Sequence, residues 1–314
     1  MPFQIRSEEP GDEEAIDLVN FRAFTAYHNE DGVPCVDEHD LVRYLRAYYP
    51  GFDRRYSFTA WDKERCVGHA LFTPARIRLM GETVPALAVG PVAVDPDYQR
   101  QGIGGELLRS GHALGRHEGF GVAFLCGHPT YYPRHGYVPC HGFAKVTIDL
   151  GALPPSSGTL HALPVTSADV PWLVACGETE WADVDFGWLW GEAVTEWTAP
   201  GAIALMWWTE DGRRAAYTLA DPRCRWRHVL GEDPNLVREA LYTIRPATLD
   251  HHPSGWVARN VLGPAWSTAE VQRGDPAMAC ELEKGILAPL LKALESGTRL
   301  PGFVNWPLPF ILIP

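Results

Sequence analysis

The feature that most constrains the fold is an apolar strand that runs directly into a glycine-rich turn and then into a helix. Residues 91–94, Pro-Val-Ala-Val, are followed over 95–105 by Asp-Pro-Asp-Tyr-Gln-Arg-Gln-Gly-Ile-Gly-Gly. Leu107, Leu108 and Leu114 then recur at helical spacing. A strand, a tight turn and a helix in this order form the unit from which α/β sheets are built. The sequence therefore predicts an α/β fold with a mixed sheet around this unit.

Apolar runs and turn residues predict the other elements of the first half. A helix is expected from Gly11 to Phe24, because its first turn carries Asp12, Glu13 and Glu14, the charge sign favoured at a helix N-terminus. The remaining patterns predict strands over 3–6, 56–61, 66–72, 84–94 and 122–125, helices over 37–49 and from 104 onward, a helical turn over 129–135 and a last pair of strands through 146–150.

A Pro/Gly/Ser cluster divides the chain. Residues 151–159, Gly-Ala-Leu-Pro-Pro-Ser-Ser-Gly-Thr, show no periodicity and separate two apolar segments. One of the twelve tryptophans, Trp61, precedes the cluster and eleven follow it. A chain of 314 residues is also long for one compact domain and comfortable for two. We therefore predict a domain over 1–150, a linker over 151–159 and a second α/β domain over 160–314.

Charge and cysteine usage restrict the partners and the compartment. The formal net charge of −12, without any Lys/Arg-rich run, opposes binding to phosphate backbones and anionic lipid, so neither nucleic acid nor a membrane is an expected partner. The seven cysteines are scattered and nowhere form Cys-x-x-Cys. No apolar run of about 18 residues and no apolar N-terminal segment occurs. These features predict a cytoplasmic protein, and both a monomer and a homo-oligomer stay open.

The glycine-rich turn is typical of an anion-binding site. Successive backbone N–H groups of such a turn form a concave nest, and the following helix adds the positive end of its dipole. At Gly102 and Gly104 a Cβ would block phosphate approach or a positive φ, and Arg100 can add a charge-assisted contact. A Walker loop is excluded because Gly-Lys-Ser/Thr is absent, and a dinucleotide fingerprint is excluded because Leu107 stands where its third glycine belongs.

Two segments resemble the GCN5-related N-acetyltransferase (GNAT) family. Residues 99–104, Gln-Arg-Gln-Gly-Ile-Gly, match its Gln/Arg-x-x-Gly-x-Gly/Ala pattern, and residues 132–137, Tyr-Pro-Arg-His-Gly-Tyr, are similar to its Tyr-x-x-x-Gly-Phe/Tyr segment. The resemblance covers about residues 1–150. It implies a GNAT fold with splayed central strands and acetyl-coenzyme A as the co-substrate, bound by Val92, Ala93, Val94, Gln99, Arg100, Gln101, Gly102, Ile103, Gly104 and Gly105.

The resemblance further implies direct transfer of the acetyl group to an amine of a small molecule or peptide. A thiolate must leave, and a phenol with an ordinary pKa near about 10 stays protonated at neutral pH and can donate to it. Tyr132 is the candidate general acid because it stands four residues before Gly136, and Tyr131 is the alternative.

A general base for the amine is less clearly indicated. Many family members carry a glutamate on the fourth strand, but residues 86–94 contain no carboxylate and Glu82 falls in the preceding turn. His128 is one candidate because its ordinary pKa is suitable. In the enhanced-intracellular-survival type of acetyltransferase, to which the Tyr-x-Arg-x-Gly-Tyr segment is similar, the C-terminal carboxylate is the base, which makes Pro314 another. The missing strand-borne base also leaves open a non-catalytic sensor of acyl-coenzyme A.

The second half shows faint similarity to the first. Residues 205–223 repeat the strand, charged turn, strand and Pro-Arg order of 58–76, and 228–244 again run from strand to helix, but without the glycine loop. We therefore expect a degenerate GNAT-like domain and one cofactor per chain, with chance similarity of common βα units as the alternative. A helix over 280–294 and a closing strand over 303–313 are also expected.

Two further ligand interpretations concern local clusters. The acidic and aromatic stretch 178–190 is suited to receive a cation, or forms a solvated face over a Trp-rich core. His251-His252 is a weak metal candidate because adjacent side chains on a regular element point apart. Five metal-ligand side chains lie within sixteen residues, but their spacing matches no standard zinc arrangement, so no metal is expected: Cys126, His128, His135, Cys140 and His141.

Overall fold

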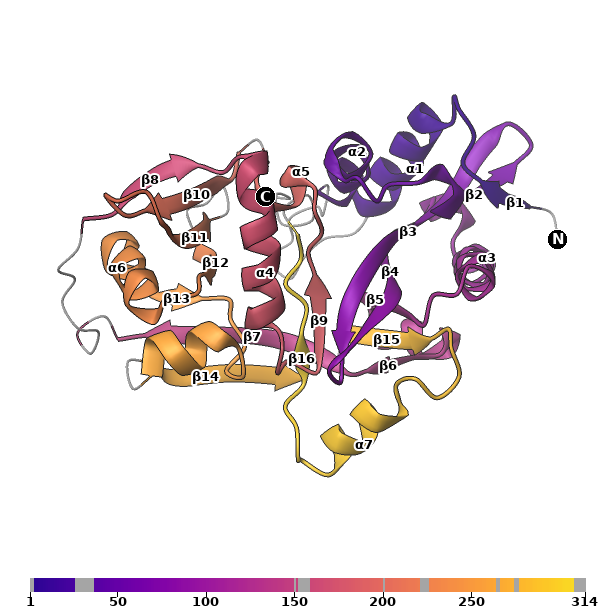
Figure 1. The fold of residues 1–314 in the computed structure, drawn as a ribbon. Helices are drawn as coiled ribbons and strands as arrows, with labels where there is room; N and C mark the ends of the chain where they lie inside the picture. Colours follow the sequence, from indigo (N-terminus) through magenta and orange to yellow (C-terminus); the bar gives the residue numbers. More distant parts are fainter. Residues whose placement is uncertain are drawn as a thin grey trace.

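The largest sheet of the molecule is mixed and has the order β1-β2-β3-β4-β5-β15-β6, with β9 paired to the far part of β3 (Figure 1). The structure, a computed structural model, describes residues 3–25, 37–149, 151, 159–199, 201–220, 226–263, 266–273 and 277–307. β4 and β5 run parallel, and the other neighbours are antiparallel. The predicted mixed α/β sheet is therefore confirmed. Its strands are β1 (Gln4–Ser7), β2 (Ser57–Asp62), β3 (Arg65–Leu79), β4 (Glu82–Val94), β5 (Val122–Cys126), β6 (Tyr137–Pro139), β9 (Phe186–Leu189) and β15 (Ala277–Glu281).

Helices α1 (Glu13–Thr25) and α3 (Ile103–His117) cover opposite faces of this sheet. A Cβ added to Gly68 on β3 would lie 2.8 Å from Ile103 of α3. The next residue, His69, instead meets Asn20 of α1, with 2.9 Å between His69 Nδ1 and Asn20 Nδ2. Successive strand residues point to opposite faces, so the two helices lie on either side. Helix α2 (Asp37–Tyr48) packs beside α1 (Figure 1).

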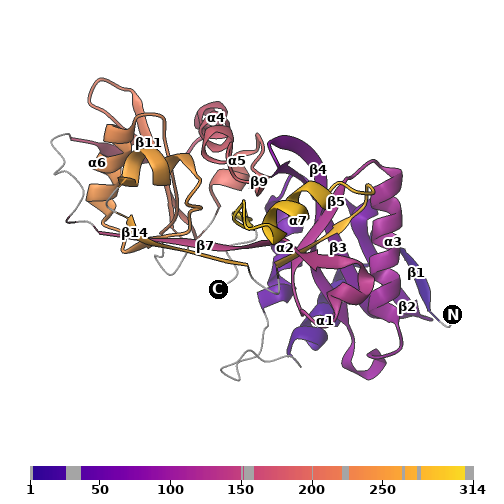
Figure 2. The ribbon, with the colours of Figure 1, turned by 90° about the horizontal axis from the view of Figure 1, so that it is seen from below.

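Two smaller sheets carry most of the second half. One has the order β12-β11-β10-β8, and in the other β13, β14 and β16 pair with β7. In Figure 2, β7 and β14 run together between the part that contains α6 and the part that contains α3. The strands are β7 (His141–Ile148), β8 (His161–Pro164), β10 (Ile203–Trp208), β11 (Arg214–Ala220), β12 (Trp226–Leu230), β13 (Thr248–Leu249), β14 (Trp266–Arg273) and β16 (Gly302–Phe303), and the helices are α4 (Val170–Glu180), α5 (Val194–Trp197), α6 (Pro234–Ile244) and α7 (Ala288–Glu295).

Strand pairing crosses the predicted boundary in both directions. β7 precedes residue 150 but pairs with β14, whereas β9 and β15 follow it and pair with β3 and β5. One apolar core joins Ile77 of β3 to Trp188 of β9. The division into 1–150 and 160–314 stays a prediction, and residues 152–158 of the predicted linker lie outside the described residues.

The helix predicted over 280–294 is wrong in its first part. Residues 277–281 form β15, which is inserted between β5 and β6, and the helix is limited to Ala288–Glu295 with Pro289 in its first turn. Pairing with distant strands, rather than local preference, makes this segment a strand, because Ala277, Met278 and Ala279 are fully buried in the sheet. Of the strand predicted over 303–313, the structure describes Gly302–Phe303 as strand, and 308–313 lie outside the described residues.

The acidic and aromatic stretch 178–190 is mostly interior, so it is not a solvated face. Trp181, Trp188 and Trp190 are buried, and the carboxylate of Glu180 is buried with them. Among the helices in the described ranges, none has the length and apolarity that crossing a bilayer requires.

Candidate active site

The parallel strands β4 and β5 separate part of the way along the sheet. They pair only where Ala86, Leu87 and Ala88 face residues 122–124, and from there to Val94 β4 is paired with β3 on its other edge. β5 instead pairs along its whole length with β15. Within the described chain, no strand pairs with this edge of β4 beyond Ala88. Apart from the Val94 carbonyl, which accepts from Gln99, the backbone N–H and C=O groups on this edge are therefore left by strand pairing to a ligand that lies between the two strands.

The open part of β4 leads into the predicted anion-binding turn, residues 95–105, which we call the anion loop. Val92 and Val94 are half-buried and Ala93 is buried. Gln99 folds back so that its side-chain Nε2 donates to the Val94 carbonyl at 3.2 Å. The strand end and the loop are thus tied together, as a continuous binding track requires.

The loop reaches helix α3 through two left-handed residues, Arg100 with a φ of 62° and Gly102 with a φ of 86°. Within the part of the chain that the structure describes, a Cβ added at Gly102 would meet no atom within 4 Å, and no side-chain hydrogen bond caps the start of α3. The first N–H groups of a helix have no intrahelical partner and favour an anion. The uncapped helix start beside open space therefore fits a phosphate group. Gln99, Arg100 and Gln101 are exposed around it.

The glycines that follow make room for the tyrosine segment. A Cβ at Gly104 would lie 2.5 Å from the Tyr131 hydroxyl, and one at Gly105 would lie 2.8 Å from the His135 ring. Gly102 thus supplies the positive φ, whereas Gly104 and Gly105 allow Tyr131 and His135 to approach the helix start. The structure brings together the two motifs that the sequence placed about thirty residues apart.

Tyr131 and Tyr132 stand side by side at this point, with ring centroids 5.1 Å apart. Burial raises the pKa of Tyr131. The half-buried Tyr132 ring lies over Gly127 and packs edge-on against Tyr137 at 5.6 Å. The Tyr137 hydroxyl in turn lies 2.8 Å from His112 Nε2 in the interior. Both candidate acids are therefore packed against other aromatic rings.

The candidate bases are less closely gathered. His128 is exposed in the turn after β5, and its carbonyl accepts hydrogen bonds from the N–H groups of Tyr131 and Tyr132 at 3.1 and 3.3 Å. Glu82 is exposed at the start of β4, at the opposite end of the strand from Val94. Pro314 lies outside the described residues.

The five metal-ligand types of residues 126–141 do not converge. His141 is buried and stacks on Phe186 with centroids 5.0 Å apart, whereas Cys126 and His128 are exposed. Across the described residues, no group of three or more His, Cys, Asp or Glu side chains could hold a metal ion.

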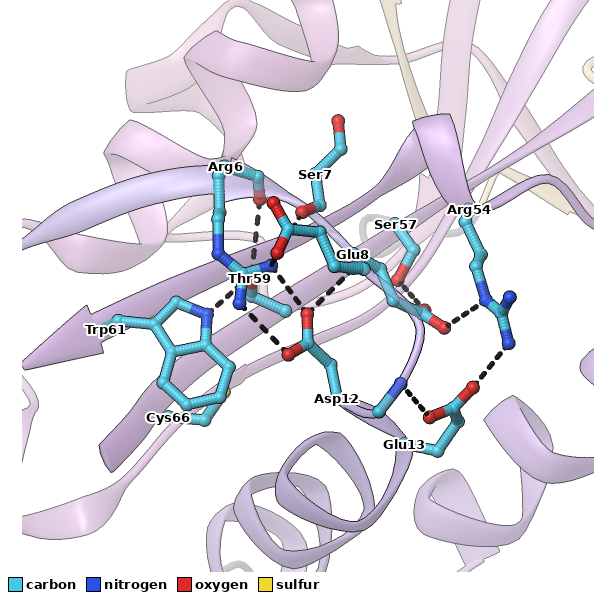
Figure 3. A network of polar contacts seen from close by, with 12 residues as sticks. Arg6, Ser7, Glu8, Asp12, Glu13, Arg54, Ser57, Thr59, Trp61 and Cys66 are labelled. Atoms are coloured by element: carbon cyan, nitrogen blue, oxygen red, sulfur yellow. Dashed lines mark hydrogen bonds and ion pairs between the residues drawn. The ribbon is translucent and has the colours of Figure 1, made fainter. Parts of the chain in front are cut away.

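Asp95 and one buried polar network were not singled out from the sequence. Asp95, at the end of β4, is buried and binds Arg22 and Arg65. A buried network also lies on the α1 side of β3, where Ser57 and Arg54 converge on Glu8 (Figure 3). Asp95 could have been suspected from the sequence because it stands between an apolar strand and a proline. Its ion pairs could not, because Arg22 and Arg65 are distant in sequence.

Comparison with known proteins relates the first half of the chain to acetyltransferase domains. Residues 12–140 match the family model of the acetyltransferase (GNAT) domain. Over 86 residues the chain is 44% identical to the uncharacterized N-acetyltransferase YjhQ of Escherichia coli (strain K12). That match spans 27% of this chain and 48% of YjhQ, about half of the relative's length. Residues 12–140 are therefore similar to the GNAT acetyltransferase domain.

Solved structures of low sequence identity share the fold over most of the chain. A GCN5-related N-acetyltransferase from Kribbella flavida is 16% identical with a TM-score of 0.67, covering 90% of this chain and 73% of its own. A probable N-acyltransferase from Enterococcus faecalis V583 is 13% identical with a TM-score of 0.63 and the same coverage. Eis1 from Mycobacterium abscessus is 14% identical with a TM-score of 0.60, covering 92% and 75%. The fold similarity thus extends beyond residue 150.

Proposed function

We propose that this chain is an N-acetyltransferase that moves an acetyl group from acetyl-coenzyme A directly to an amine of a small molecule or peptide. The observation that carries the proposal is the continuity of two features. Among the described residues, the edge of β4 beyond Ala88 is open, and it leads straight to the uncapped start of α3. An extended thioester arm that ends in a pyrophosphate matches this track in shape and charge.

The residues present fit that co-substrate. The N–H groups of Gly102, Ile103, Gly104 and Gly105 would receive the pyrophosphate, supplemented by Gln99, Arg100 and Gln101. The backbone of Val92, Ala93 and Val94 would pair with the pantetheine arm. An N–H group on the same edge can stabilise the oxyanion that forms when the amine attacks the carbonyl.

The proton for the leaving thiolate is assigned to Tyr132, with Tyr131 as the alternative. Tyr132 occupies the motif position and is held between Gly127 and Tyr137. Tyr131 has its hydroxyl at the start of α3 beside Gly104, and burial raises its pKa, so it stays protonated at neutral pH. Both phenols can therefore serve as acids, and substitution distinguishes them.

The amine must lose a proton before it attacks, and His128 or the carboxylate of Pro314 is proposed to accept it. The described part of β4 carries no acidic side chain beyond Glu82. This observation favours the second candidate function, a sensor that binds acyl-coenzyme A without turnover.

We also propose that the second half is a degenerate GNAT-like domain that binds no second coenzyme. β12 leads into α6 as β4 leads into α3, but Asp233 caps α6 by accepting from the Asn235 N–H at 2.9 Å. A carboxylate of the chain thus occupies the place that an anion would take. One co-substrate per chain is the consequence.

Thiol release from acetyl-coenzyme A in the presence of an amine panel tests the function. Amine-dependent release, with acetylated product identified by mass spectrometry, supports the transferase. Tight binding without release from any acceptor supports the sensor. Tyr132→Phe is expected to lower kcat, whereas Tyr242→Phe on α6, also a half-buried tyrosine, leaves it unchanged. Full turnover by Tyr132→Phe and loss in Tyr131→Phe would move the acid role to Tyr131.

A further inference from the structure

We infer that Asp95 is a positioning residue that holds the anion loop in the shape that receives the coenzyme A pyrophosphate. The inference rests on the proposed function. Asp95 lies between the last residue of β4 and the turn that begins the loop, so it is placed where the loop leaves the sheet.

Hydrogen bonds join Asp95 to the sheet, and they also join the turn that follows to Asp95. Its N–H donates to the Val67 carbonyl of β3 at 3.0 Å. Its carbonyl accepts from the Tyr98 N–H at 2.8 Å, and its Oδ1 accepts from the Asp97 N–H at 3.1 Å. The first turn of the loop is therefore built around this one residue.

Two guanidinium groups from other elements meet on the same carboxylate. Arg22 of α1 donates from Nε at 2.8 Å and from Nη2 at 3.2 Å, and Arg65 of β3 donates from Nη2 at 2.8 Å. The Asp95 side chain is 1% exposed, so these bonds are shielded on its side. Burial works to raise its pKa, but the hydrogen bonds from Arg22, Asp97 and Arg65 outweigh it and hold the pKa below the ordinary value. The carboxylate stays ionised at neutral pH.

Helix α1 is also held near the open segment of β4, at a second point. Asn20 of α1, two residues before Arg22, lies 2.9 Å from His69 Nδ1, and His69 pairs across the sheet with Ala93. The helix is thus fixed both beside the strand segment that ends in Val94 and at the start of the loop. Arg22 transmits that fixed position to the loop through Asp95.

A prearranged loop has a specific thermodynamic consequence. N–H groups that already point at the phosphate position lose little conformational freedom when the ligand arrives, so affinity rises without any new contact. Asp95 itself faces Arg22 and Arg65, and it is an anion, so it does not bind the pyrophosphate. Its removal should therefore weaken co-substrate binding and leave the transfer step itself unaffected.

Calorimetric titration of the full chain with coenzyme A, together with steady-state kinetics, tests this inference. Asp95→Asn keeps the size of the side chain but removes its charge. We expect the dissociation constant and the KM for acetyl-coenzyme A to rise by about tenfold, with kcat within about twofold. Asp97→Asn is the matched control, because Asp97 also meets Arg22 and Arg65, at 3.0 and 3.6 Å, but is 65% exposed. Its dissociation constant should change by less than about twofold.

Three results would overturn the inference. An Asp95→Asn protein that melts at a lower temperature but binds coenzyme A as wild type does would reduce Asp95 to a structural role. A fall in kcat with an unchanged KM would place it in the chemistry. If Asp95→Asn does not fold, the Arg22→Gln/Arg65→Gln variant must show the rise in KM for acetyl-coenzyme A that was expected of Asp95→Asn. An unchanged KM in that double variant would also contradict the inference. Absence of coenzyme A binding by the wild type would instead refute the proposed function.

Discussion

The buried hydroxyl of Ser57 connects a chain of hydrogen bonds whose direction follows from the available protons. One Asn20 Nδ2 hydrogen goes to the Ile16 carbonyl at 2.8 Å and the other to His69 Nδ1 at 2.9 Å, so Nδ1 is an acceptor. Burial lowers the pKa of His69 to about 3, which keeps the ring neutral with its proton on Nε2. That proton is donated to Ser57 Oγ at 3.0 Å, and Ser57 donates to Glu8 Oε2 at 2.6 Å.

Ser57→Ala removes the acceptor of His69 Nε2–H and leaves that buried donor unsatisfied. Glu8 keeps its bonds to Arg46 at 2.9 Å and Arg54 at 3.2 Å, so the main cost falls on His69. Leaving a buried donor without a partner costs about 1–3 kcal/mol. We therefore expect the free energy of unfolding to fall by about 2 kcal/mol.

Urea unfolding at pH 7, followed by circular dichroism, measures this change. Ser7→Ala is the control, because the Ser7 hydroxyl makes one exposed hydrogen bond, to the Arg55 carbonyl at 3.0 Å, and its loss should cost less than about 0.5 kcal/mol. Equal unfolding midpoints for the two variants would refute the assigned direction of the chain and the importance of this network.

Three further outcomes concern the loop, the tyrosines and pH. Gly102→Ala strains a residue with a φ of 86° and should weaken coenzyme A binding in calorimetry. Gly212→Ala is the control, because Gly212 has a φ of 80° in an equally open turn, and it should not weaken binding. Equal effects of the two substitutions would contradict the loop's role. Gly104→Ala would set a Cβ 2.5 Å from the Tyr131 hydroxyl and should lower turnover in the thiol assay; full turnover would show that this contact is dispensable. Burial lowers the pKa of His112 and His141 to about 4, so the unfolded chain binds more protons below about pH 6.5. The melting temperature should therefore fall as pH drops from about 6.5 towards 4, and a constant value between pH 7 and 5 would contradict this.

Local sequence predicted the part of the fold that carries the site. The run from Val92 to Gly105 specifies a strand, a left-handed turn at Gly102 and a helix start within a few residues, so each element follows from its neighbours. The structure agrees to within two residues at the start of β4, at the start of α3 and at the end of β5.

Long-range pairing could not be predicted in the same way. β15 lies between β5 and β6, although about 150 residues separate Cys126 from its partner Ala277. Nothing near Ala277 encodes that choice, and its apolar run suits a buried helix as well as a strand. His251 is a similar case, because its Nδ1 lies 3.0 Å from the buried Glu180, whose stretch 178–190 is expected from the sequence either to receive a cation or to form a solvated face.

A structure of the protein with coenzyme A bound is the most direct test of the central claim. We predict that the pyrophosphate lies within hydrogen-bond distance of the N–H groups of residues 102–105. The pantetheine arm should run along Val92–Val94 in the opening between β4 and β5, with a hydroxyl of Tyr132 or Tyr131 facing the sulfur. Coenzyme A bound elsewhere, with that opening closed by protein side chains, would contradict the account.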